Sequence, residues 1–187
     1  AVIARIHAQD FCLAADPAGR GVTGALRRRA VALNGELLPD AEPVADGQRL
    51  EYRRGAVMEW FENRAEGLEQ GFVLKPQTGN LKPEHLNLVV KFETELRVTV
   101  VEDGQAVLLT DAKGGAQYRY AGLKVTDANH QPVVSFFQSP IKNPKSQIVR
   151  IVCNASRAQF PITIDPVLTS MAKKLLAPDG AAGDALG

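Results

Sequence analysis

The chain has 187 residues, which suffices for one domain of ordinary size or for two small ones. Hydrophobic residues make up 45% and charged residues 23% of the chain, so the composition excludes a disordered, collagen-like or coiled-coil protein and predicts a folded, soluble one. The formal net charge of +1 at pH 7 gives no general attraction to nucleic acid, to an anionic membrane or to acidic substrates.

The first 58 residues contain several candidate strands separated by turn residues. The turns are predicted at 17–19, 34–35 and 46–47, and the strands at 2–6, 11–15, 26–33 and 48–53. Asn34-Gly35 is the strongest of these turn signals, because both residues accept the positive φ values of a two-residue hairpin turn. We expect residues 1–55 to form a β-rich segment of the main domain or a small β subdomain.

The clearest strand is predicted over 85–92, where every second residue is apolar. Next, Asp103-Gly104 separates two apolar runs and predicts a hairpin over 96–110 with a tight type I′ turn. Two short strands are expected over 117–120 and 123–126, with a break at Gly122, and further strands from Val133, over 148–153 and over 162–164. Short strands without intervening amphipathic helices predict an all-β fold, an antiparallel β-sandwich that occupies residues 56–166.

Residues 167–187 are expected to leave this sandwich as an exit linker. Leu168, Met171 and Leu175 recur at helical spacing, which favours a short helix over 167–177. Asp165-Pro166 precedes this segment, and a proline that stops strand pairing favours an extended exit instead. Eleven residues leave both alternatives open.

The cysteines and histidines give no sign of a metal or a catalytic site. Cys12 and Cys153 lack the spacing of a zinc site, and they form either one long-range disulfide or two buried apolar positions. His7, His85 and His130 are scattered and have no second ligand at suitable spacing. No phosphate-binding glycine motif and no run of about 18 apolar residues occurs. We therefore expect no cofactor, no metal and no transmembrane segment.

The densest acidic cluster surrounds the single tryptophan, Trp60. Glu59 and Glu69 lie near it in the sequence, and two carboxylates beside an aromatic ring are the groups that a glycoside hydrolase uses. A softer interpretation is a carbohydrate-binding face on which Trp60 stacks against a sugar. The plainest interpretation is solvated glutamates next to a buried indole.

One stretch of the chain has only basic charges. Between Asp127 and Asp165 the sequence holds no acidic residue, whereas Lys142, Lys145, Arg150 and Arg157 are basic. Such an excess suits an anionic glycan or surface, although lysines also protect exposed strand edges. Within the same stretch, residues 154–156 (Asn-Ala-Ser) fit a glycosylation sequon.

Four motifs in the second half of the chain are familiar in their order and spacing. They are EWFEN leading into GLEQGF (59–72), RYAGLKVTD (119–127), FPITIDP (160–166) and DGAAGD (179–184). Together they resemble the β-rich N-terminal region that precedes FG-GAP repeats, the blades of integrin-α-like β-propellers, in large bacterial secreted or surface proteins. The resemblance covers about residues 50–187, and the calcium-binding loops of such propellers would lie beyond Gly187, since Asp179 and Asp184 alone supply too few oxygens.

The residues and the resemblance together predict a non-catalytic module of an exported bacterial protein, located outside the cell or on its surface. The resemblance implies that it packs against or presents downstream β-propeller-type repeats of the same polypeptide, and that it supports adhesion or interaction with a glycan or a surface protein. Nucleic acid is not expected as a partner. The alternatives are a carbohydrate-binding module that uses Trp60, Glu59 and Glu69 and, behind it, a glycoside hydrolase.

Overall fold

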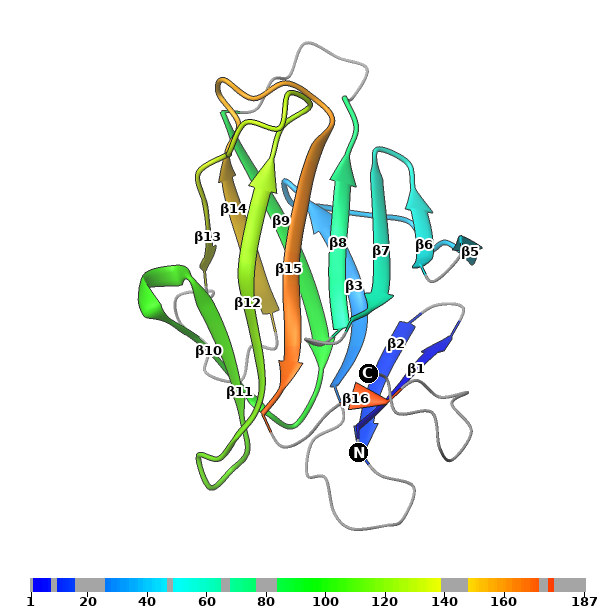
Figure 1. Ribbon diagram of the computed structural model, residues 1–187, viewed down its shortest axis with the longest axis vertical. Coiled ribbons are helices and arrows are strands. Elements are labelled where there is room, and N and C mark those ends of the chain that lie inside the picture. The colour runs from blue at the N-terminus through cyan, green and yellow to red at the C-terminus, as the bar shows by residue number, and fades with distance from the viewer. Residues whose placement is uncertain are drawn as a thin grey trace.

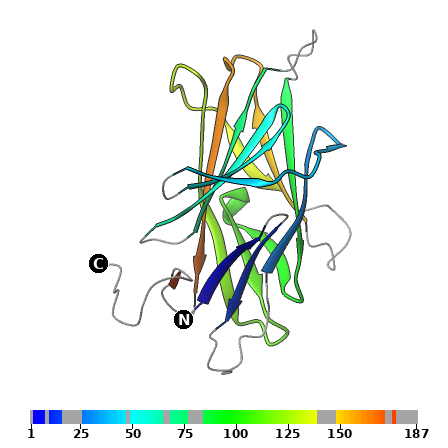
Figure 2. The same ribbon diagram turned by 90° about the vertical axis from the view of Figure 1, so that its right-hand side faces the viewer.

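A computed structural model describes residues 2–7, 10–15, 26–46, 49–64, 68–76, 84–138, 148–171 and 175–176. Two sheets of eight strands each lie face to face in a sandwich, and Figures 1 and 2 show its two layers from perpendicular directions. The described residues contain no α-helix; their one helical element is a 3₁₀ turn, η1 (Glu102–Gly104). The predicted antiparallel, all-β sandwich is confirmed.

The first sheet has the strand order β13-β14-β9-β3-β2-β1-β16, and β4 pairs with β3 beside this path. Its strands are β1 (Val2–His7), β2 (Asp10–Ala15), β3 (Leu26–Leu33), β4 (Glu36–Leu37), β9 (His85–Glu93), β13 (Ser135–Gln138), β14 (Ile148–Asn154) and β16 (Leu175–Leu176). Every ladder in it is antiparallel except the short one between β1 and β16.

The second sheet has the strand order β10-β11-β12-β15-β8-β7-β6-β5 and is antiparallel throughout. Its strands are β5 (Pro43–Asp46), β6 (Arg49–Arg54), β7 (Val57–Asn63), β8 (Leu68–Leu74), β10 (Arg97–Val101), β11 (Ala106–Thr110), β12 (Ala116–Thr126) and β15 (Ile162–Ser170). The N-terminal strands thus contribute to both sheets, since β3 pairs with β9 and β6 pairs with β7.

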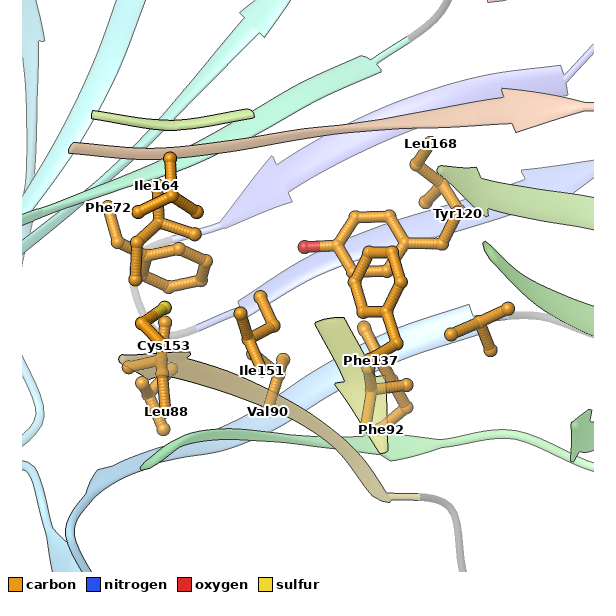
Figure 3. Packing of buried hydrophobic residues seen from close by; sticks show 14 of the residues in the cluster. Phe72, Leu88, Val90, Phe92, Tyr120, Phe137, Ile151, Cys153, Ile164 and Leu168 are labelled. Carbon is orange, nitrogen blue, oxygen red and sulfur yellow. The ribbon is translucent and has the colours of Figure 1, made fainter. Parts of the chain in front are cut away.

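The hydrophobic core fills the space between the sheets. In the strands that line this space, such as β8, β9, β12, β14 and β15, alternate residues point inward, because successive side chains of a β-strand leave opposite faces. Phe72 and Ile164 of the second sheet face Leu88 and Cys153 of the first, as Figure 3 shows, and all four are fully buried. The Tyr120 ring lies 5.3 Å, centroid to centroid, from that of Phe137 on β13.

The predicted hairpins are present, but one of their turns differs. Asn34 and Gly35 have φ values of 52° and 88° and join β3 to β4 in a two-residue turn, as expected. The β10–β11 hairpin instead has a four-residue connection, because Val101 pairs with Ala106. Asp103 and Gly104 adopt positive φ inside η1, so the predicted two-residue type I′ turn at that position is wrong.

Pro166 does not end a strand, contrary to the sequence interpretation. β15 continues through it to Ser170 as a central strand, and Val167 pairs with Ala121 on one side and with Glu69 on the other. The proline lies opposite the bulge that Gly122, with a φ of 66°, introduces into β12. A bulge leaves the ladder interrupted at that point, so the missing proline N–H costs no hydrogen bond.

The C-terminal segment is extended where it is described. Residues 167–170 belong to β15, and Leu175–Leu176 pairs with Val2 and Ile3 of β1. The helical alternative for 167–177 is therefore wrong in these described parts, because strand pairing on both sides satisfies the backbone that a helix would have to bond internally. Residues 179–184 of the fourth motif and the predicted turn at 17–19 lie outside the described residues.

The sheet order separates the two cysteines. Cys153 is a buried, free thiol. Cys12 pairs with Arg27 of β3 and Cys153 with Leu86 of β9, so that β3 and β9 lie between their strands. Three strand spacings amount to about 14 Å, which exceeds the distance that a disulfide spans between two Cα atoms. Burial raises the pKa of Cys153 to about 12.

Candidate functional site

The acidic and aromatic residues singled out in the sequence lie on β7 and β8, but on opposite faces of the second sheet. Val57, Glu59 and Phe61 point toward the first sheet, whereas Trp60, between them, points away from it. Glu69 is also on the outer face, since it pairs with Glu62 and both carboxylates bind the Arg64 guanidinium. The structure therefore brings Trp60 and Glu69 to one face and places Glu59 on the other.

Glu59 belongs to a polar chain that crosses the interior of the sandwich. Tyr120 donates its hydroxyl proton to Gln70 Oε1 over 2.9 Å, and Gln70 Nε2 donates to Glu59 Oε1 over 2.9 Å. Arg54 Nε lies 3.4 Å from Glu59 Oε2, and its Nη1 donates to the Pro39 carbonyl over 2.6 Å. The side chain of Glu59 is fully buried and that of Arg54 is 2% exposed.

The hydrogen bonds among Tyr120, Gln70, Glu59 and Arg54 fix which of these side chains carries each proton. Burial, followed by the negative charge of Glu59, raises the pKa of Tyr120 well above its usual value, so its hydroxyl stays a donor. The guanidinium of Arg54 neutralises a carboxylate that would otherwise be costly to bury. Because its side chain is fully buried, Glu59 stabilises the fold rather than contacting a ligand.

Trp60 is covered on both faces of its ring. The residue paired with it on β8 is Gly71, and a Cβ built there would lie only 2.1 Å from Cε2 and Cζ2 of the indole. The guanidinium of Arg49 covers the other side, with its carbon 3.9 Å from the ring centroid. Trp60 is 3% exposed, and a sugar that stacked on it would first have to displace Arg49.

These positions bear on two hypotheses from the sequence, the glycoside hydrolase and the carbohydrate-binding module. A glycosidase needs two carboxyl groups that flank one glycosidic bond within the same cleft, but Glu59 points into the core and Glu69 points out of the second sheet. The pair Glu59 and Glu69 therefore cannot form that site. A sugar platform on Trp60 lacks the open ring face that stacking requires.

A second acidic pair does form on the outer face of the second sheet. Asp165 of β15 hydrogen bonds to Glu69 of β8, and Arg64 lies 2.9 Å from Glu69. Partial burial, followed by the charge of Glu69, raises the pKa of Asp165 to about 6. Oδ1 of Asp165 has no partner among the described residues.

The fold should lose stability as this pair ionises. Because the folded-state pKa of Asp165 exceeds its usual value of 3.8, protonated Asp165 favours folding, and the free energy of unfolding should fall between about pH 4 and pH 6. Urea unfolding at intervals across this range measures the slope. Asp165→Asn should flatten the slope at these pH values and leave the variant more stable than wild type at pH 7. An unchanged slope in Asp165→Asn would contradict this assignment.

A groove of about 590 Å³ lies at one end of the sandwich, between the loop 127–134 that follows β12 and the loop 154–159 that follows β14. Figure 1 shows these loops side by side at the top of the molecule. Asp127 joins them: its Oδ1 accepts from the N–H groups of Asn129 and Gln131, and its Oδ2 accepts from that of Gln159. These bonds lower the pKa of Asp127 and use both of its oxygens.

The remaining candidate ligands are dispersed. His85 and His130 are exposed and lie in different segments, and His7 ends β1. Among the residues described, no three histidine, cysteine or carboxylate side chains gather as metal ligands would. No described helix is long and apolar enough to cross a membrane.

Sequence analysis alone missed the partners that decide what these residues do. Arg54, Gln70 and Tyr120 gave no motif, although the alternation of 57–61 with 68–74 already placed Glu59 and Gln70 on the faces of apolar neighbours. Arg157 was noted only as part of a basic stretch. Comparison of the chain with known proteins found no matching family model, no matching curated protein and no matching solved structure.

Proposed function

We propose that this chain is a non-catalytic β-sandwich module of an exported bacterial surface protein, which packs against β-propeller-type repeats of the same polypeptide and presents them. The observation that carries the proposal is that Glu59 and Trp60, the residues best suited to bind a ligand, contact other side chains of the fold instead. Glu59 is fully buried against Arg54 and Gln70, and Trp60 is held between Gly71 and Arg49. The exported, repeat-containing context rests on the four-motif resemblance to proteins with FG-GAP repeats.

The end of β15 supplies a surface for such a contact. Met171 directly follows this central strand and is 51% exposed, so a partner that covers it would remove apolar surface from water. The chain passes from there to β16 at the edge of the first sheet. Repeats that follow in the polypeptide would be tethered close to this end, which raises their effective concentration at Met171.

A docking measurement tests the proposal. This chain and the repeats that follow it in the encoded polypeptide should form a 1:1 complex in sedimentation velocity, and Met171→Asp should weaken the complex about tenfold by placing a charge in the contact. Leu37→Asp is the matched control, because Leu37 is 68% exposed but lies on β4, away from the end of β15. Monodisperse, non-interacting components, or equal effects of the two substitutions, would contradict the proposal.

A further inference from the structure

The groove between the loops 127–134 and 154–159 holds one basic and one acidic side chain, those of Arg157 and Asp127. Arg157 lines it and makes no ion pair with any described residue, while the one carboxylate in the lining, Asp127, is occupied by three backbone N–H groups. The sequence places no further acidic residue between Asp127 and Asp165. Because Asp127 already accepts these backbone hydrogen bonds, the Arg157 guanidinium is left to pair with an anionic group of a ligand.

The walls of the groove are preorganised. Besides the bonds of Asp127, the Ala128 N–H donates to the Gln159 carbonyl over 2.9 Å, which ties the two loops together a second time. The second loop is anchored on its other side, where the Ala155 N–H donates to the Glu84 carbonyl over 2.8 Å. A ligand that binds here therefore does not have to order the loops first, which lowers the entropic cost of binding.

Three further polar side chains in the groove, those of Asn129, Gln131 and Gln159, are planar amides. The side chains of Asn129 and Gln159 have no hydrogen-bond partner among the described residues, and Gln131 uses only Nε2, in a 3.4 Å contact with the Asn129 carbonyl. Each amide offers both a donor and an acceptor, which matches neighbouring sugar hydroxyls. Val133 and Ala158 supply partly buried apolar surface between them, against which a ring can lie.

The backbone around the groove argues against a peptide that adds to the sheet. Such peptides need unpaired N–H and C=O groups at a strand edge. Here the Val133 N–H already donates to the Val125 carbonyl, and the Asn154 N–H donates to the Val134 carbonyl. Recognition in this groove must therefore come from side chains.

We propose that this groove binds an acidic polysaccharide, with Arg157 holding a carboxylate or sulfate group and the amides of Asn129, Gln131 and Gln159 bonding the hydroxyls of the same or the next sugar. The site lies before the first residue of β15, whereas the docking end at Met171 follows its last residue. Because these are opposite ends of a nine-residue strand, the binding of polysaccharide and the docking of repeats can be lost independently.

Isothermal titration calorimetry with oligogalacturonate, whose only anionic groups are carboxylates, and with sulfated galactan oligosaccharides, whose only anionic groups are sulfates, tests the proposal and distinguishes carboxylate from sulfate. Binding to at least one of them is expected, and the neutral analogues, fully methyl-esterified oligogalacturonate and desulfated galactan, should bind at least about tenfold more weakly. Arg157→Ala should weaken binding about ten- to hundredfold, with partial recovery in Arg157→Lys, which restores the charge without the bidentate geometry.

Arg97→Ala is the matched control, because it removes the same charge from an exposed position on the edge strand β10. Its affinity and the thermal stability of all variants should remain at the wild-type level. The proposal is overturned if neither acidic oligosaccharide binds, if the neutral analogues bind equally well, or if Arg97→Ala and Arg157→Ala lose the same affinity. Selection of peptides rather than glycans by the same groove would also overturn it.

Discussion

Glu59→Ala is expected to lower the free energy of unfolding by about 3–5 kcal/mol, because it leaves the Arg54 guanidinium charged, buried and without its carboxylate. Arg54 is 2% exposed and its Nη2 already lacks a partner among the described residues, so water cannot replace Glu59 without opening the core. The same substitution removes the acceptor of Gln70 Nε2. Urea unfolding at pH 7, followed by far-ultraviolet circular dichroism, measures the loss.

Asp40→Ala provides the control, since Asp40 contacts the same guanidinium at 3.8 Å but its side chain is 75% exposed. Its loss should stay within about 1 kcal/mol, as is usual for exposed ion pairs. The double variant Arg54→Met, Glu59→Leu should regain part of the stability that Glu59→Ala loses, because it also removes the buried charge. Equal losses of unfolding free energy in Glu59→Ala and Asp40→Ala would show that the buried pair of Glu59 and Arg54 contributes no more than the exposed pair of Asp40 and Arg54.

Gly71→Val is expected to destabilise the protein at the upper end of about 1–3 kcal/mol, the range for overpacked sites. Any Cβ at this position meets two indole carbons of Trp60 at 2.1 Å, and Arg49 stands on the other side of the ring. The Trp60 ring must therefore move away from its position over residue 71 of the neighbouring strand. Chemical unfolding measures the loss, and a red shift of the tryptophan emission reports the displacement of the ring.

A double-mutant cycle isolates this contact. Gly71→Ala should cost stability in the wild type but little in a Trp60→Ala background, where the space above Gly71 is open. Val73→Ala, on the same face of β8, is the comparison for a change that creates no clash. If Gly71→Ala costs the same with and without Trp60, the glycine is required for another reason.

The local signals in the sequence predicted most strands because alternation and turn chemistry are short-range. The strand at 85–92, the Asn34-Gly35 hairpin and the strand at 148–153 all appear within a residue or two of their predicted bounds. The order of strands in the two sheets was beyond these signals. So was the role of Pro166, because a proline is compatible with a central strand only where a bulge in a neighbour, here at Gly122, interrupts the ladder.

The candidate site was harder to predict for a physical reason. Glu59 and Trp60 are adjacent in sequence, and their chemistry suggested one surface, but adjacent residues of a strand face opposite sides. Applying the alternation of Val57 and Phe61 to Glu59 assigns it to the core. The pairing of Asp165 with Glu69 joins residues 96 positions apart and follows only from the adjacency of β15 and β8.

Acrylamide quenching of tryptophan fluorescence tests most directly whether the aromatic and charged residues of the second sheet serve its packing. The chain has one tryptophan, so the emission reports on Trp60 alone. A ring enclosed between a glycine backbone and a guanidinium should emit at short wavelength, resist quenching in the native state and become accessible only on unfolding. Native emission that is quenched as readily as that of the unfolded chain would contradict this view of Trp60.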